Sequence, residues 1–302
     1  MYKYTTISFP ALGLEWDPIR VIHLGPLNIH LYGIIIAFGL MLAVFYAWKR
    51  CHAFGINEDH LTDGVLCVVP FAILCARAYY CAFQWKTEFA DDPISVLYIW
   101  NGGLAIYGGV IGAVIGVAVF SKIRKMNLPA LLDLVALGFL IGQSIGRWGN
   151  FFNREAFGSE TENFLRMGLY NTITGNTEYH HPTFLYESAW NAAGFLLLHF
   201  LSHRRKYDGQ IALGYVVWYG LGRAFIEGLR TDSLYWGPFR VSQLLAAVSC
   251  LAAAAVLLYQ TFREHRSEQL AGYQAPEEAP VTAEEETAEE SAEESAEEET
   301  NP

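Results

Sequence analysis

The chain has 302 residues, of which 53% are hydrophobic and 15% aromatic, and its formal net charge is −11. The apolar residues form long continuous blocks, which is typical of an integral membrane protein and argues against a soluble enzyme or a nucleic-acid-binding protein. The charge is unevenly spread: residues 264–302 contain 14 acidic residues and one arginine, whereas residues 1–263 contain 19 basic and 17 acidic residues. The acidity therefore belongs to the C-terminal segment, and we expect no nucleic-acid partner.

Seven apolar blocks are long enough to cross a membrane as helices, because spanning about 30 Å of hydrocarbon takes about 20 residues. The sequence therefore predicts an all-α, polytopic membrane protein whose helices form one domain over residues 1–266. Residues 267–302 are predicted to be a disordered acidic tail, because they contain almost nothing that can enter a core. The seven transmembrane helices are expected near residues 30–48, 61–83, 102–120, 130–147, 183–201, 210–227 and 241–262.

Basic residues follow every second predicted helix. Loops rich in Lys and Arg stay in the cytoplasm, so we expect the N-terminus outside and the tail in the cytoplasm. The opposite, longer connections hold more functional groups, which predicts a site in the outer half of the membrane. Half of the 20 Lys and Arg residues lie on the predicted cytoplasmic side, at Lys49, Arg50, Lys122, Arg124, Lys125, Arg204, Arg205, Lys206, Arg263 and Arg266.

Two residue types indicate structure and not chemistry. The five cysteines lie in or beside apolar segments without metal-binding spacing, so we expect neither disulfides nor a metal site. Gly108, Gly112 and Gly116 recur every four residues in the third predicted helix, a spacing that lets two membrane helices approach closely. The stretch from Gly102 to Gly109 holds more glycine than packing requires, which predicts a bent or ligand-bound backbone.

Three arginines fall within predicted helices or at their outer ends, namely Arg77, Arg147 and Arg223. An arginine at the bilayer centre costs about 2.5–3.5 kcal/mol on insertion scales, so all three need partners or a polar cavity. For Arg77, an internal ion pair is an equally good explanation. Together with nearby acids, the three favour a cavity lined with arginine.

Carboxylates accompany these arginines. Tyr219, Arg223 and Glu227 recur every four residues and lie along one side of the sixth helix, while Glu187 lies about one turn inside the fifth. A role limited to neutralising an arginine is an alternative explanation for each glutamate. Because guanidinium forks also match phosphate oxygens, the residues indicate a pocket for the head group of an anionic lipid. Asp133, near the cytoplasmic end of the fourth helix, is expected to make a helix-start or interhelical contact.

Four stretches of this chain resemble one family, the bacterial prolipoprotein diacylglyceryl transferases. The most specific is GRWGNFFNREAFG at 146–158, where polar residues lie among aromatic ones at the end of an apolar segment. The other three are HLYG at 30–33, HPTFLYE at 181–187 and YGLGRAFIEGLRTD at 219–232. They occur in the family's order, and the resemblance covers about residues 20–262.

The resemblance implies an enzyme of the bacterial cytoplasmic (inner) membrane, with its active site towards the outer face and with membrane lipids around it. Such enzymes move the diacylglyceryl group of phosphatidylglycerol to the lipobox cysteine thiol in a prolipoprotein signal peptide, forming a thioether and releasing glycerol phosphate. No cofactor is implied. By motif position, Arg147 and Arg223 are implied to be catalytic. The expected substrate-binding residues are Tyr32, Asn150, Asn153, Glu155, Glu187, Tyr219 and Glu227, to which we add Arg77 and His30.

Tyr107 departs from part of the family, in which a histidine precedes the corresponding Gly-Gly pair. A phenol with a pKa near 10 is a poor base at neutral pH unless an arginine lowers that pKa. We keep Tyr107 as a catalytic candidate, either as the base or as a phosphate ligand. Glu155, His180 and His30 are the alternative bases.

Other functional classes use similar residues. An organic-anion transporter needs the same arginine-lined cavity, but it favours inverted repeats and broken helices, and the chain has no second copy of GRWGN or YGLGR. A membrane acyltransferase would show a different set of motifs. In a purely structural bundle, the charges would pair internally and need not gather on one side of the membrane.

Overall fold

The structure is a computed structural model that describes residues 3–25, 27–99, 102–231, 235–236, 239–263 and 270–272. The chain divides into two units, Met1–Gly272 and Tyr273–Pro302. Apart from residues 270–272, the predicted acidic tail (267–302) lies outside the described residues. All described residues belong to the first unit.

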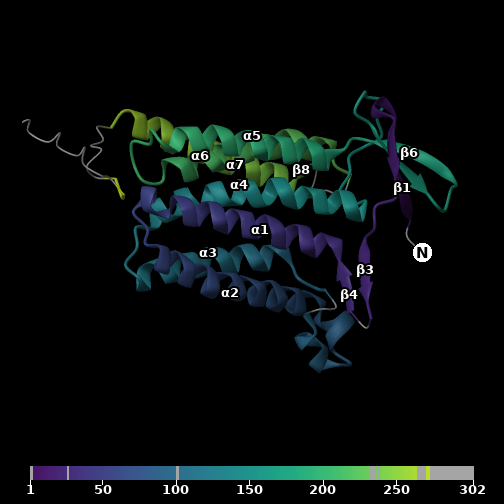
Figure 1. Cartoon of the computed structure of the whole chain (residues 1–302), viewed down its shortest axis with the longest axis horizontal. Coiled ribbons are helices and arrows are strands. Elements are labelled where there is room, and N and C mark those ends of the chain that lie inside the picture. The colour runs from purple at the N-terminus through teal and green to yellow at the C-terminus, as the bar shows by residue number, and fades with distance from the viewer. Residues whose placement is uncertain are drawn as a thin grey trace, which may run out of the picture. The chain divides into compact units, whose positions relative to one another are not determined.

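Seven long α-helices lie side by side in the described part of the chain (Figure 1). Each coincides with one of the seven apolar blocks of the sequence. Helix α4 packs against α1, α5 and α6, while α2 pairs with α3 and α6 with α7. The central position of α4 brings the end of this helix close to several others. The helices are α1 (Leu31–Arg50), α2 (Glu58–Gln84), α3 (Ile106–Ile123), α4 (Leu128–Asn153), α5 (Thr183–Ser202), α6 (Gln210–Ile226) and α7 (Val241–Thr261).

Five of these helices, α1, α2, α3, α4 and α7, are long and apolar enough to cross a membrane. Large apolar side chains on their outer surfaces, including Met41, Leu74 and Leu251, are exposed and need a hydrocarbon environment. Helices α5 and α6 do not meet the same standard, since α6 has 17 residues and α5 carries Glu187 and Asn191. Membrane crossing by α5 and α6 stays a prediction.

Short strands gather at one end of the helices, and the all-α prediction did not include them. They escaped prediction because each is too short and too mixed in polarity to form an apolar block. Strands β1 (Tyr4–Phe9), β2 (Leu14–Trp16), β5 (Met167–Asn171) and β6 (Asn176–His180) form an antiparallel sheet in the order β2-β1-β5-β6. Two hairpins join β3 (Val21–Leu24) to β4 (Leu27–His30) and β7 (Tyr235–Trp236) to β8 (Phe239–Arg240).

An aromatic cluster fastens the sheet to the end of α4. The ring of Phe151, on α4, lies 4.9 Å from that of Phe184 on α5 and 5.5 Å from that of Trp16 on β2. One residue after α4, Arg154 has a left-handed backbone (φ 54°) and a buried side chain. Its guanidinium pairs with Asp17 and donates to the carbonyls of Thr5, Phe152 and Pro18. The N-terminal segment is thereby fixed beside the last turn of α4.

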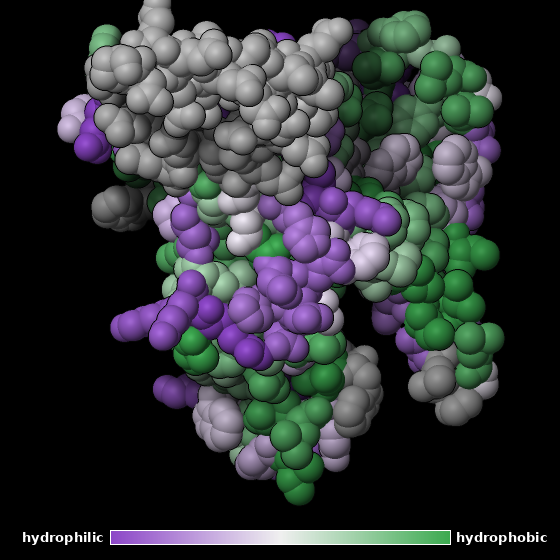
Figure 2. All heavy atoms as spheres, turned by 60° about the vertical axis from the view of Figure 1, so that its left-hand side comes forward, coloured by the Kyte–Doolittle hydropathy of each residue, from purple (hydrophilic) through white to green (hydrophobic). Residues whose placement is uncertain are grey.

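The opposite end of the helices holds the basic loops. Arg50 donates to Ser202 at 3.2 Å and Asn127 to Asp208 at 2.7 Å, which joins loops distant in sequence. The carboxylate of Asp133 accepts from the amides of Gly209 and Ala212 at the start of α6, both at 2.8 Å, so the predicted interhelical contact is confirmed. Figure 2, turned towards this end, shows hydrophilic residues gathered in the middle and hydrophobic residues around them.

The predicted glycine packing of α3 is also confirmed. A Cβ on Gly112 would lie 2.5 Å from that of Cys75 on α2, and a Cβ on Gly108 would lie 2.5 Å from the Cys75 carbonyl oxygen. Ala105 donates from its backbone to Ala76 at 3.1 Å where the two helices meet. Side chains at these glycines would force α2 and α3 apart.

Replacing Gly108 with alanine is therefore expected to destabilise the protein by about 1–3 kcal/mol. The contacting atoms are the Cβ of Tyr79 and backbone atoms of Cys75 and Ala76, none of which can rotate away. The neighbouring Gly109→Ala is the control, since the nearest atom to its new methyl group is Ala76 Cβ at 3.6 Å. Thermal unfolding in detergent should show a lower midpoint for the first variant alone. Equal midpoints would contradict the close packing of α2 and α3.

Candidate active site

Three arginines converge on one buried carboxylate at the end of the helices that carries the strands. Glu187, on α5, is only 5% exposed. Its Oε2 lies 2.5 Å from Nη2 of Arg147 on α4. Its Oε1 lies 3.3 Å from Nη1 of Arg223 on α6 and 3.2 Å from Nη1 of Arg230. Charged residues that the sequence places in different segments thus form one cluster.

A second carboxylate, Glu227, extends the cluster towards α7. It opens the short 3-10 helix η6 (Glu227–Leu229), and its Oε2 lies 2.7 Å from Nη2 of Arg223. Ser242, in the first turn of α7, donates to Oε1 at 2.5 Å, and Arg240 donates to the Glu227 carbonyl. The guanidinium of Arg223 is therefore held between two carboxylates on different elements.

The end of α4 adds amide groups beside Arg147. Nη1 of Arg147 lies 3.4 Å from Oδ1 of Asn150, while Asn150 and Asn153 donate to Oε1 of Glu155 at 3.1 and 3.2 Å. Tyr32, on α1, interacts electrostatically with both Arg147 and Glu155. A Cβ on Gly149 would lie 2.5 Å from the Tyr32 ring, so this glycine lets α1 approach α4 closely.

Hydrogen bonds to main-chain carbonyls connect three of the sequence motifs. The amide of Gly158 donates to the carbonyl of His181 at 2.9 Å, and that of Ser159 to the carbonyl of Leu229 at 2.7 Å. Thr183 Oγ1 donates to the carbonyl of Ala156 at 2.5 Å. Burial lowers the pKa of His181 below its ordinary value, so its imidazole is neutral at pH 7.

Two tryptophans fix α5 against α6 next to the charges. The rings of Trp190 and Trp218 stack with centroids 4.4 Å apart, and each indole Nε1 donates to the other residue's carbonyl at 2.9 Å. Trp190 lies one turn from Glu187 on α5. The reciprocal pair therefore sets the position of the Glu187 carboxylate relative to Arg223.

The family model described as prolipoprotein diacylglyceryl transferase matches residues 19–259. The chain belongs to this family. A phosphatidylglycerol–prolipoprotein diacylglyceryl transferase of Bacillus licheniformis is 42% identical over 256 residues, covering 82% of this chain and 94% of the relative. Relatives with the same name from Bacillus velezensis and Limosilactobacillus reuteri are 39% and 43% identical, covering 86% and 80% of this chain and 97% and 90% of the relatives.

Membership of the family and the five apolar helices together identify a multi-pass membrane protein. Of the predicted site residues, the structure brings Arg147, Arg223, Glu187 and Glu227 into direct contact. Tyr32, Asn150, Asn153 and Glu155 form the adjoining group at the end of α4.

Three other predicted site residues of this chain lie outside the charge cluster. Tyr107 lies at the start of α3 and is 58% exposed; within the described residues its hydroxyl has no hydrogen-bond partner. His30 precedes α1 and is exposed, with Val21 opposite it in the β3–β4 hairpin. On α6, Tyr219 stacks on Tyr215 with ring centroids 5.7 Å apart.

The buried Arg77 holds a loop and has no ion pair among the described residues. Its guanidinium donates to four main-chain carbonyls, those of Ser95 (2.7 Å), Val96 (2.9 Å), Gly102 (2.7 Å) and Gly103 (3.0 Å). Both glycines have a positive φ, and a Cβ on Gly103 would clash with Nη1 of Arg77. The start of the glycine-dense stretch is thus bent around this arginine, which explains Gly102 and Gly103.

Replacing Arg77 with lysine is expected to lower the thermal unfolding midpoint and to speed proteolysis between residues 90 and 105. A lysine ammonium cannot reach four carbonyls from one position, so some would be left unsatisfied. Limited proteolysis and thermal unfolding, measured with the rate of catalysis, separate the possible roles. A higher KM for the lipid at unchanged stability would instead support the predicted substrate-binding role of Arg77.

Three cluster residues were not among the predicted site residues. Arg230 follows Glu227 by three residues, and this spacing predicts that it shares the helix face of Arg223 and Glu227, although it was not counted as a site residue. Arg240 and Ser242 precede or open the seventh apolar block, and neither residue type stands out there. Only the return of the chain through the β7–β8 hairpin places them beside Glu227.

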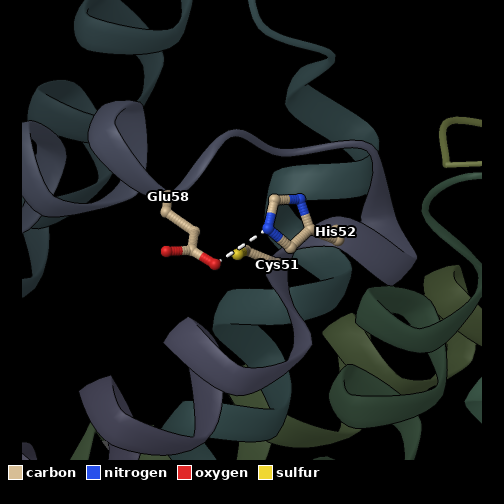
Figure 3. A group of neighbouring side chains, drawn as sticks. All are labelled: Cys51, His52 and Glu58. Atoms are coloured by element: carbon tan, nitrogen blue, oxygen red, sulfur yellow. Dashed lines mark hydrogen bonds and ion pairs between the residues drawn. The ribbon is translucent and has the colours of Figure 1, made fainter.

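Within the described residues, one group of side chains could share a metal ion: Cys51, His52 and Glu58, whose donor atoms lie within 4.8 Å of one another (Figure 3). His52 Nε2 and Glu58 Oε1 are already paired at 2.8 Å, and the Cys51 thiol donates to the Trp48 carbonyl at 3.1 Å. Each donor therefore has a protein partner. The group lies between α1 and α2, at the end opposite the arginine cluster.

Proposed function

We propose that this chain transfers the diacylglyceryl group of phosphatidylglycerol to the lipobox cysteine of a prolipoprotein. The observation that carries the proposal is the convergence of Arg147 and Arg223 on one carboxylate, because guanidinium groups gathered around an anion are suited to a lipid phosphate. The family and the names of the relatives agree with this reaction. Nothing in the comparisons supports the alternative of an organic-anion transporter.

In the proposed reaction, the cysteine thiolate attacks the glycerol carbon of the diacylglyceryl group that bears the phosphate. A carbon–sulfur bond forms, the carbon–oxygen bond breaks, and its electron pair leaves with glycerol phosphate. Arg147 and Arg223 stabilise the charge that grows on the departing phosphate. A positive field also favours the thiolate over the thiol, whose ordinary pKa is near 8.5.

The remaining predicted residues take supporting roles in this proposal. Asn150, Asn153 and Glu155 bind hydroxyl groups of the head group, and Tyr32 and Tyr219 flank the lipid. Tyr107 and His30, both exposed at the strand-bearing end, are proposed to meet the incoming peptide; Tyr107 also remains a candidate for proton acceptance.

We further propose that the protein lies in the bacterial cytoplasmic membrane with its N-terminus and sheet outside. The basic loops at the opposite end would then face the cytoplasm, as expected for loops rich in Lys and Arg. The arginine cluster would open towards the outer leaflet, and the acidic tail would be cytoplasmic. The orientation is tested with single cysteines introduced at Ser8 and Ser267 in a variant whose five native cysteines are replaced. In intact cells, only the cysteine at position 8 should react with a membrane-impermeant reagent, and the opposite result would refute this orientation.

The reaction is tested by incubating a synthetic lipobox peptide with purified protein and phosphatidylglycerol, followed by mass spectrometry. The expected result is a mass gain of one diacylglyceryl group on the cysteine, absent with a folded Arg147→Ala variant. A peptide that stays unmodified by folded wild-type protein in fluid lipid would refute the proposal.

A further inference from the structure

Glu187 differs from the other carboxylates of the cluster in what holds it. Within the described residues, the groups that contact its carboxylate are the guanidinium groups of Arg147, Arg223 and Arg230. Both oxygens are used, since Arg223 Nη1 lies 3.3 Å from Oε1 and 3.4 Å from Oε2. The carboxylate therefore sits among the guanidinium forks where phosphate oxygens would otherwise be bound.

Glu227 provides the contrast within the same cluster. The hydroxyl of Ser242 donates to its Oε1, and Arg240 donates to its main-chain carbonyl. Its carboxylate is thus attached to α7 as well as to Arg223. Glu187 is instead positioned through its own helix, by the reciprocal Trp190–Trp218 pair, and its carboxylate can yield guanidinium groups to another anion without losing its place.

We infer that Glu187 is a resident counter-anion that shares its arginines with the lipid phosphate and takes them back as glycerol phosphate leaves. This inference rests on the proposed function. In the empty site, Glu187 keeps three positive groups together that would otherwise repel one another. When lipid binds, the phosphodiester competes for Arg147 and Arg223, and Glu187 keeps part of their hydrogen bonds.

The reaction increases the negative charge of the phosphate, which affects how tightly the arginines bind substrate and product. A phosphodiester carries one negative charge, whereas the released phosphomonoester carries about −1.5 to −2 at pH 7. Arginines alone would therefore bind the product more tightly than the substrate and slow its release. A fixed carboxylate within the same cluster repels the additional product charge, so Glu187 sets the balance between substrate binding and product release.

The test compares Glu187→Gln with Glu227→Gln in product inhibition by glycerol phosphate. Removing the Glu187 charge is expected to lower the inhibition constant at least about tenfold, because charges a few ångströms apart in a partly desolvated site interact strongly. The KM for phosphatidylglycerol should fall less, and pre-steady-state experiments with substrate in excess over enzyme should show a rapid first turnover followed by slower cycles. Glu227→Gln should change the ratio of the two constants much less.

An unchanged or weaker inhibition constant in a folded Glu187→Gln protein would overturn the inference, as would equal effects of the two variants. Should the variant fail to fold, the wild type supplies a second measurement. Its inhibition by glycerol phosphate, a near-dianion, is compared with that by glycerophosphoglycerol, a monoanionic diester. We expect the diester to bind at least as tightly, and clearly tighter binding of the monoester would contradict the role of Glu187. A wild type without transferase activity would instead refute the proposed function.

Discussion

Turnover is expected to fall by at least about 100-fold when Arg147 or Arg223 is replaced with lysine, the scale of losing one preorganised donor to a developing negative charge. Arg147 already uses one side of its guanidinium on Glu187 and the other on Asn150, and Arg223 bridges Glu187 and Glu227. Each therefore needs a planar fork to serve two partners and the phosphate at once. A lysine ammonium is a point charge and cannot reproduce that geometry.

The measurement is the initial rate of peptide modification at saturating phosphatidylglycerol, with folding checked by thermal unfolding. The matched control is Arg124→Lys, since Arg124 pairs with Asp63 between α2 and the end of α3, in the basic-loop region, and lysine can keep this exposed pair. The control should retain nearly the wild-type rate. A folded Arg147→Lys or Arg223→Lys protein with near-normal turnover would remove these arginines from the proposed chemistry.

The sequence predicts the helices better than it predicts the sheet, for a physical reason. A membrane helix satisfies its own backbone hydrogen bonds, so an apolar block of sufficient length identifies it directly. The strands at the end of the bundle depend on partners distant in sequence: β1 pairs with β5 across about 160 residues. Neither the length nor the polarity of residues 4–9 indicates that pairing.

The residues of the candidate site also differ in how well the sequence predicts their contacts. Arg223 and Glu227 could be placed on one helix face from their spacing, and Glu187 could be placed near the outer end of the fifth helix. Asp133 could be assigned an interhelical contact. Arg77 could not be assigned its partners, because backbone carbonyls of a bent loop leave no charged residue in the sequence to find. The contacts of Arg240 and Ser242 with Glu227 likewise follow from a chain reversal that local patterns do not encode.

Helices α5 and α6 connect the fold to the proposed function. Neither meets the standard of length and apolarity that the other five helices meet, and Glu187 on α5 contacts Arg223 on α6. Charges at this depth are expensive unless they are paired, so the two helices must be held in register for the pairing to form. The stacked Trp190 and Trp218 supply that register, and small residues make room for the two indoles.

Replacing Gly222 with alanine is accordingly expected to destabilise the protein by about 1–3 kcal/mol and to reduce turnover sharply in the protein that remains folded. A Cβ on Gly222 would clash with Nε1 of Trp190, the atom that donates to the Trp218 carbonyl. Displacing this indole shifts α5 against α6 and lengthens the contact between Glu187 and Arg223. A misplacement of about 1 Å can cost about 100-fold in rate.

Gly142→Ala is the matched control, because Gly142 lies in α4 and a Cβ there would have nothing within 4 Å. This variant should leave the rate unchanged and keep or slightly raise the unfolding midpoint, since alanine has a higher helix propensity than glycine. Unfolding midpoints and peptide-modification rates are measured for both variants beside the wild type. Wild-type activity in Gly222→Ala would mean that the tryptophan pair stabilises the bundle without setting the geometry of the arginines. Loss of activity greater than the loss of folded protein would show that the α5–α6 register is part of the active site.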